Sequence, residues 1–258
     1  MLKRLLLLIG LSLLSLPSWA VLSDAEAMNL SGMQRMLSQR IAKNYLMIGA
    51  EIRTEVAIQQ LDQSVAKFES NYQALSQYAP TDEIRNALSD AGRTWNSYRE
   101  LALSLPDKQQ APQLLEQSDR LLAQSEKVVQ LIEKHTGSQG ARLVNRSGRQ
   151  RMLSQRIAKL YLAMSWHLPV NQLDAEFQRA VEEFDVALKE LQSAEQNTPA
   201  ISKALQQVDA QWRFSRAGFR LSADARYVPT VITTTTETLL SQMNELTKAY
   251  EGVMQAGS

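Results

Sequence analysis

The sequence contains, at residues 29–46, the stretch Asn29-Leu-Ser-Gly-Met-Gln-Arg-Met-Leu-Ser-Gln-Arg-Ile-Ala-Lys-Asn-Tyr-Leu46. It returns as Asn145-Arg-Ser-Gly-Arg-Gln-Arg-Met-Leu-Ser-Gln-Arg-Ile-Ala-Lys-Leu-Tyr-Leu162, at an offset of 116 residues, with 15 of 18 positions identical. Sparser matches continue beyond it, among them Phe68 with Phe184 at 116 and Leu121-Leu122 with Leu239-Leu240 at 118. The chain is therefore a tandem duplication.

The repeated segment keeps its polar residues as well as its apolar ones. A core accepts swaps of similar volume and a solvated face accepts almost any polar residue, so packing alone does not explain why both copies hold Ser, Gln and Arg. A shared role for these polar groups is one explanation. Recent local gene conversion is the other.

Composition and helix signals predict an all-α fold. Gly and Pro make up only 17 of 258 residues. Ser23 and Glu26 form a capping-box pattern, which places the start of the first helix near residue 24, and we expect that helix to run to about Met47. Breaks near 48–53, 79–82 and 106–112, and again at 167–171, 197–199 and 227–229, give four helices in each half.

Each half is predicted to be an antiparallel four-helix bundle. Leu61, Val65, Phe68, Tyr72 and Leu75 recur at the spacing of a helix packed on one face. We divide the chain into a first repeat at 21–138 and a second at 139–258. The segment 134–139 joins them, although a continuous helix there is an alternative.

Residues 1–20 have the pattern of a secretory signal peptide. Lys3 and Arg4 precede an apolar run from Leu5 to Leu16, and Ala20 offers a cleavage site. A retained anchor is the alternative, but such a short run does not cross ~30 Å of hydrocarbon. We expect an exported, periplasmic protein.

Several function classes are unsupported by the composition. The chain has no cysteine, two histidines and a formal charge of +1, so thiol chemistry is excluded and general nucleic-acid binding is not expected. No arrangement of a nucleophile with a base or of metal ligands is present. We predict that the protein is not an enzyme and has neither a metal nor a cofactor.

On a helix, Gly32, Arg35 and Gln39 share one stripe of the repeated segment. Gly32 costs about 1 kcal/mol of helix stability relative to Ala, which fits a close approach of a backbone or a ligand at that turn. Arg40 and Lys43 point elsewhere, and we expect them at the surface or in ion pairs. Arg149 replaces Met33 in the second copy, where it either tunes a pocket or faces water, and we expect it to face water.

The pattern Asn-x-Ser-Gly-x-x-Arg-Met-Leu-Ser-Gln-Arg resembles the type IV pilus methyl-accepting chemotaxis transducer N-terminal domain, the PilJ-type family. It is also similar to the periplasmic helix of nitrate/nitrite sensor kinases. In those sensors the Arg after the Gly clamps one anion between two subunits, which implies this role for Arg35 and Arg151. The candidate ligand-binding residues are Arg35, Arg151, Gly32, Gly148, Gln39, Gln155, Ser31 and Ser147.

The duplication suggests that the two halves pack about a pseudo-two-fold axis and share one anion pocket. The protein would then be a sensory module that binds nitrate or nitrite and reports to a membrane chemoreceptor or sensor kinase, because the sequence carries no cytoplasmic signalling domain of its own. The alternative function is an envelope or type IV pilus-associated interaction module without a small-molecule ligand. A homodimer, with two sites each completed by a second chain, is also left open.

Overall fold

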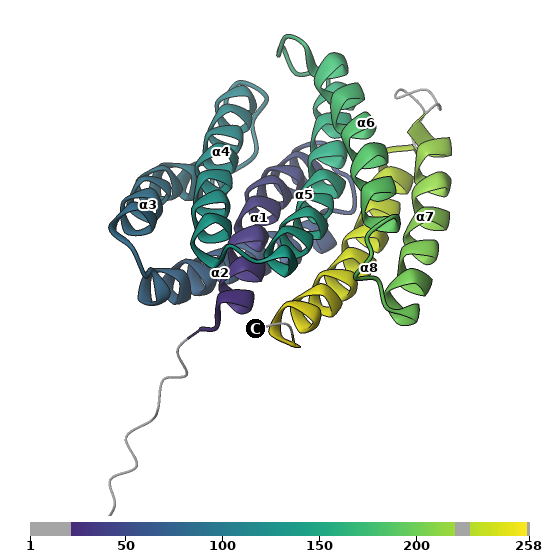
Figure 1. The fold of residues 1–258 in the computed structure, drawn as a ribbon. Helices are drawn as coiled ribbons and strands as arrows, with labels where there is room; N and C mark the ends of the chain where they lie inside the picture. Colours follow the sequence, from purple (N-terminus) through teal and green to yellow (C-terminus); the bar gives the residue numbers. More distant parts are fainter. Residues whose placement is uncertain (1–21, 220–227, 257–258) are drawn as a thin grey trace, which may run out of the picture.

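The computed structural model describes residues 22–219 and 228–256, and its regular elements there are all helices (Figure 1). This confirms the predicted all-α class. The elements are α1 (Asp24–Gly49), α2 (Thr54–Tyr78), α3 (Asp82–Ala102), α4 (Ala111–Thr136), α5 (Gln139–Ser165), α6 (Leu173–Gln192), α7 (Pro199–Phe219) and α8 (Val228–Ala256).

Local sequence signals set the helix starts. The Ser23 side chain accepts a hydrogen bond from the Glu26 backbone and the Glu26 side chain returns to Ser23, so the expected capping box is present. Thr81 caps α3 and Ser138 caps α5 in the same manner. α1 ends two residues beyond the predicted Met47.

A two-residue break separates the two repeats. Gly137 adopts a left-handed conformation with φ of 65° after α4, and Ser138 then caps α5. A continuous helix across 134–139 is therefore wrong. The predicted break at 227–229 lies partly outside the described residues, since the structure resumes with Val228 already in α8. The predicted signal peptide at 1–20 also lies outside them.

The two repeats build equivalent bundles. In the first, α1 packs between α2 and α4, and α3 packs on α4. In the second, α5 packs between α6 and α8, and α7 packs on α8. Phe68 stacks on Trp95 with ring centroids 4.0 Å apart, and Phe184 stacks on Trp212 at the same distance. The two repeats therefore pack equivalent aromatic residues in the same way.

The bundles meet through α1 and α5, which lie side by side at the centre of the molecule, with α3 and α7 farthest out (Figure 1). α1 is antiparallel to α8, because Asn29 bonds Glu251 and Lys43 bonds Glu237. α5 is also antiparallel to α8 as its bundle neighbour, so α1 and α5 run in the same direction. This parallel pairing gives the pseudo-two-fold relation of the repeats.

Candidate functional site

The two copies of the repeated segment meet at their glycines. A Cβ placed on Gly32 would lie 3.8 Å from Cα of Gly148, and one on Gly148 would lie 3.8 Å from Cα of Gly32. The two backbones therefore lie close together, and an added Cβ would be in van der Waals contact with the opposite helix. The equivalent glycines therefore define the crossing of α1 and α5.

Arg35 and Arg151 come together at this crossing. Their Nη2 atoms would lie 3.4 and 3.2 Å from a Cβ on Gly32, and 3.3 and 3.2 Å from one on Gly148. Both side chains are inaccessible to solvent, with 0% and 1% of the residue surface exposed. Two guanidinium groups thus occupy the space that the two glycines leave free.

Each arginine reaches across to the opposite helix. Arg35 donates from Nη2 to the Asn145 carbonyl at 3.1 Å, and Arg151 donates from Nη2 to the Asn29 carbonyl at 3.2 Å. Arg151 also donates from Nη1 to Oδ1 of Asn29 at 2.8 Å. The Nε atoms of both arginines are buried and have no hydrogen-bond partner among the described residues.

The two asparagines are held by acids of neighbouring helices. Asn29 donates its amide to Glu251 of α8, and Asn145 donates its amide to Glu133 of α4. Asn29 and Asn145 are the equivalent first residues of the two motif copies, and the motif did not predict a role for them at the site. Their identity in both copies was the available signal.

The symmetry fails at one pair of equivalent positions. Arg35 Nη1 forms an ion pair with Glu126 of α4 at 2.7 Å. The equivalent residue, 118 positions later, is Asn244 of α8, whose Oδ1 accepts a long hydrogen bond of 3.4 Å from Arg151 Nη1. Arg151 consequently contacts no carboxylate among the described residues.

Burial and the lack of a contacting carboxylate in the described part of the chain destabilise the charged form of Arg151. Desolvation, followed by repulsion from Arg35, lowers the pKa of Arg151 to about 9, although the more distant Glu251 opposes the shift. Desolvation also lowers the pKa of Arg35, but Glu126 opposes it directly. A negative charge placed beside Arg151 would relieve this penalty.

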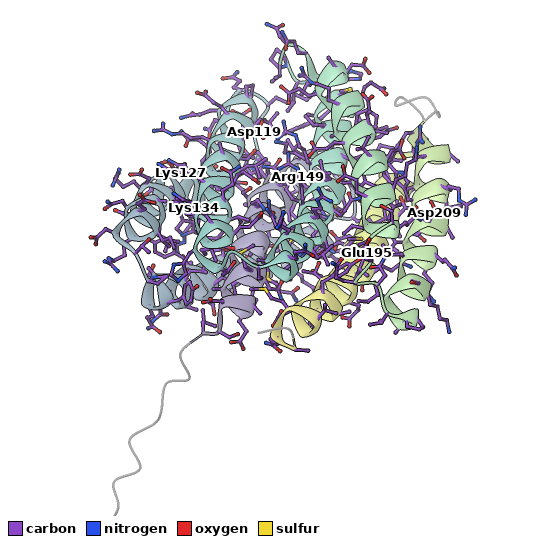
Figure 2. All side chains as sticks on the ribbon, viewed as in Figure 1. Asp119, Lys127, Lys134, Arg149, Glu195 and Asp209 are labelled. Carbon is purple, nitrogen blue, oxygen red and sulfur yellow. The ribbon has the colours of Figure 1, made fainter. Side chains whose placement is uncertain are left out.

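Arg149 does not simply face water, contrary to our expectation. Its side chain, labelled near the centre of the molecule in Figure 2, is 38% exposed. It pairs with Glu183 and, at 3.2 Å, with Glu126. Glu126 is therefore shared between Arg35 and Arg149. The substitution of Met33 by Arg149 makes the two repeats electrostatically unequal, and it does so at the arginine pair.

The remaining candidate residues lie away from the guanidinium groups. Ser31 and Ser147 donate to the carbonyls of Met28 and Val144 in their own helices. Gln39 Nε2 donates to the Ser118 carbonyl in α4 and Gln155 Nε2 to the Thr236 carbonyl in α8, which ties each central helix to its bundle partner. The structure thus brings together Arg35, Arg151, Gly32 and Gly148 only.

Two further ion-pair clusters join the repeats. Arg40 and Lys43 of α1 pair with Glu237 of α8 in the other repeat. Their equivalents Arg156 and Lys159 of α5 pair with Asp119 of α4. The expected ion pairs of Arg40 and Lys43 are confirmed, but the complete burial of Lys43 was not foreseen.

The geometry, a duplicated helix with Arg and Gly at a shared crossing, agrees with a family comparison. The model of the PilJ family, type IV pili methyl-accepting chemotaxis transducer N-term, matches residues 17–121 and 135–225. The chain belongs to the PilJ family. It carries two tandem copies of the PilJ domain, as the repeated motif indicated.

PilJ domains are non-catalytic sensory domains of chemotaxis transducers, in which they lie on the periplasmic side of the membrane. No curated protein and no solved structure matches this chain significantly. Across the described residues, no helix combines the length and apolarity that a membrane span needs, and no cluster of His, Cys, Asp and Glu could hold a metal ion.

Proposed function

We propose that this PilJ protein is a periplasmic sensory module that binds one small anion between Arg35 and Arg151 and reports its occupancy to a membrane chemoreceptor or sensor kinase. The observation that carries the proposal is the state of Arg151. Its guanidinium is buried beside that of Arg35 and touches no carboxylate among the described residues. A buried charge in that state is costly, and an anion would compensate it.

The donor set suits a small planar oxyanion. Arginine offers a rigid fork of N–H groups that matches the in-plane oxygens of such a ligand. The Nε atoms of Arg35 and Arg151 are available, and the Nη2 groups now bound to the Asn29 and Asn145 carbonyls could exchange those partners for the anion. The two repeats, which each contribute one arginine, would then hold the same ligand.

The charge balance favours a monovalent anion. Glu126 already compensates the charge of Arg35, so a single negative charge on the ligand is enough to compensate that of Arg151. A second charge on the ligand would face Glu126 at short range in a poorly solvated site. Nitrate and nitrite meet this requirement, and the motif's similarity to nitrate/nitrite sensor kinases supports the same choice.

An anion at the crossing would act on both repeats at once. Arg35 belongs to the first bundle and Arg151 to the second, so binding would change the contact of α1 with α5. This contact joins the two bundles, and its rearrangement is the change that a receptor or kinase would detect. A ligand can shift a protein between two conformations only if it binds one of them more tightly than the other.

The test is thermal unfolding of the purified protein in nitrate, nitrite, chloride, sulfate and phosphate at equal ionic strength. A ligand at about 100 times its Kd adds ~2.7 kcal/mol, which raises Tm by several degrees for a chain of this size. We expect nitrate or nitrite to raise Tm, and Arg35→Met and Arg151→Met to abolish the rise.

Arg213→Met is the matched control, because Arg213 lies exposed on α7 and pairs with Asp209 of its own helix. It should keep the full anion response. If the folded wild-type protein has the same Tm in all five salts, the anion proposal is contradicted.

The second candidate function is an envelope or pilus-associated interaction module without a small ligand. It is favoured by the hydrogen bonds of the arginines to the Asn29 and Asn145 carbonyls, which can serve solely to lock α1 onto α5. In that case both arginine substitutions lower Tm, and they do so equally in every salt.

A further inference from the structure

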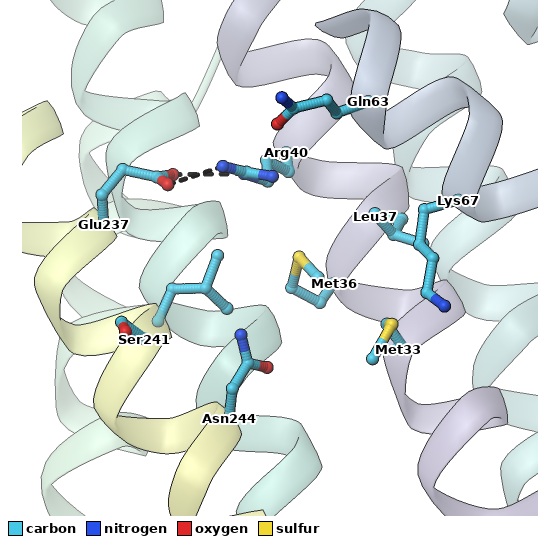
Figure 3. A pocket seen from close by; sticks show the side chains of 10 residues that line it. Met33, Met36, Leu37, Arg40, Gln63, Lys67, Glu237, Ser241 and Asn244 are labelled. Carbon is cyan, nitrogen blue, oxygen red and sulfur yellow. Dashed lines mark hydrogen bonds and ion pairs between the residues drawn. The ribbon is translucent and has the colours of Figure 1, made fainter. Parts of the chain in front are cut away.

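A cavity of about 430 Å³ lies between the repeats, with α1 and α2 of the first repeat on one side and α8 of the second on the other (Figure 3). Its volume falls within the range of small-molecule sites. No residue of α4 and none of the candidate ligand-binding residues lines it. The cavity is therefore distinct from the arginine pair.

One wall of the cavity is apolar. Met33, Met36 and Leu37 of α1 contribute to it (Figure 3), and Leu240 of α8 also lines the cavity. Methionine side chains adapt their shape to a ligand more readily than branched ones. This wall suits the aliphatic or aromatic body of a small organic molecule.

The polar wall carries one uncompensated charge. Arg40 and Glu237 both line the cavity, but they pair with each other at 2.7 Å. Lys67 of α2 forms no ion pair among the described residues, and its ammonium points toward Met33 in Figure 3. Asn244 adds an amide from α8. The cavity thus offers a cation and a hydrogen-bonding amide beside an apolar wall.

The equivalent place, between α5 and α6 of the second repeat and α4 of the first, is filled by charged side chains. Met33, Lys67 and Asn244 correspond to Arg149, Glu183 and Glu126, at offsets of 116, 116 and 118. Arg149, Glu183 and Glu126 form an ion-pair bridge from α6 through α5 of the second repeat to α4 of the first. Met33, Lys67 and Asn244 replace all three members of the bridge, and the cavity lies where the bridge would be.

We propose that this cavity binds a small organic carboxylate, with its apolar body against the methionines and its carboxylate on Lys67 and the Asn244 amide. The charge of Lys67 favours an anion, and the apolar wall favours a molecule with a hydrocarbon part over an inorganic ion. The site does not depend on anion binding at the arginine pair. Asn244 nevertheless touches both places, because its Oδ1 also contacts Arg151.

The experiment is a titration of the full-length protein, labelled with ¹³C at its methionine methyl groups, with hexanoate as the probe. We expect saturable shifts of the Met33 and Met36 signals and none of Met152, the equivalent of Met36 in the second repeat. Hexylammonium, which has the same body and the opposite charge, should not produce them.

Lys67→Glu should weaken hexanoate binding by at least about tenfold, because it reverses the charge that holds the carboxylate. Lys67 is exposed, so its replacement leaves the core intact. Lys127→Glu, on the exposed face of α4, is the matched control and should bind as the wild type does. Met33→Arg combined with Lys67→Glu copies residues of the second repeat and should abolish the Met36 shift.

The result that overturns the proposal is the absence of a saturable shift at Met33 and Met36, or an equal shift with hexylammonium. Unchanged binding in Lys67→Glu overturns it as well. Because Arg151→Met leaves the cavity wall in place, that variant should retain the hexanoate shifts even if it loses its response to nitrate. The two sites can therefore fail independently.

Discussion

Glu126 and Asn244 occupy equivalent positions in the two repeats, but they differ in charge. Glu126 places a carboxylate beside the buried Arg35, whereas Asn244 places a neutral amide beside the buried Arg151. Arg35 forms an ion pair with Glu126 at 2.7 Å, whereas Arg151 donates a long hydrogen bond of 3.4 Å to Oδ1 of Asn244. The duplicated chain is therefore asymmetric at the point where its symmetry axis passes between two arginines. In the proposed mechanism, the ligand supplies the charge that Asn244 lacks.

Asn244→Glu should stabilise the protein and remove its response to anions. The new carboxylate would pair with Arg151 as Glu126 pairs with Arg35, and a charge-assisted bond of this kind contributes roughly 2 kcal/mol. Urea unfolding with and without nitrate measures both effects. A variant that gains no stability, or one that still responds to nitrate, would show that Arg151 does not lack a counter-charge.

Glu126→Gln is the reciprocal substitution. It removes the carboxylate shared by Arg35 and Arg149, so the free energy of unfolding should fall by about 3 kcal/mol. The stabilisation by nitrate should become larger than in the wild type, because two buried arginines then lack a counter-charge. An undiminished stability would contradict the role given to Glu126.

Gly32→Leu should separate the central helices and lower stability by roughly 2 kcal/mol or more. Its Cβ would meet Nη2 of Arg151 at 3.2 Å, and the remaining side-chain atoms would find the Gly148 backbone in their way. Chemical unfolding measures the loss. The control is Gly252→Ala in α8, where nothing lies within 4 Å of the added Cβ and the gain in helix propensity is at most about 1 kcal/mol.

Glu237→Gln should cost about 3 kcal/mol of folding free energy, because it leaves the fully buried Lys43 without its ion-pair partner. The measurement is again urea unfolding at neutral pH. Glu245→Gln, an exposed position on the same helix, should change stability little. Equal effects of the two substitutions would mean that the cluster does not join the repeats.

The same cluster predicts a loss of stability in acid. Burial alone would raise the pKa of Glu237, but Lys43 and Arg40 outweigh it and lower the pKa from 4.5 to about 2. A carboxyl group whose pKa is lower in the folded state stabilises the protein above pH 4.5, and this contribution is lost as the pH falls from 4.5 to about 2. Unfolding free energies across that window should decline less steeply in Glu237→Gln than in the wild type.

Sequence patterns predicted most of the fold. The capping box at Ser23 and the breaks around Pro80, Pro106 and Pro199 act within a few residues, so they can be read along the chain. The near-identity of the two motif copies also predicted that Arg35 and Arg151 are equivalent. Local signals of this kind determine where helices begin and end, and they determine which residues share a helical face.

The tertiary structure alone decided which distant groups meet. Glu126 lies 91 positions from Arg35 in the sequence, and Asn244 lies 93 from Arg151, so no helical period relates them. Contacts between helices that are distant in the sequence also produce three other features: the burial of Lys43 against Glu237, the bridge formed by Arg149 and the cavity beside Met33. By itself the sequence determined the eight helices and their duplication; the parallel packing of α1 on α5 decided which charges are compensated, because burial and pairing depend on neighbours from other helices.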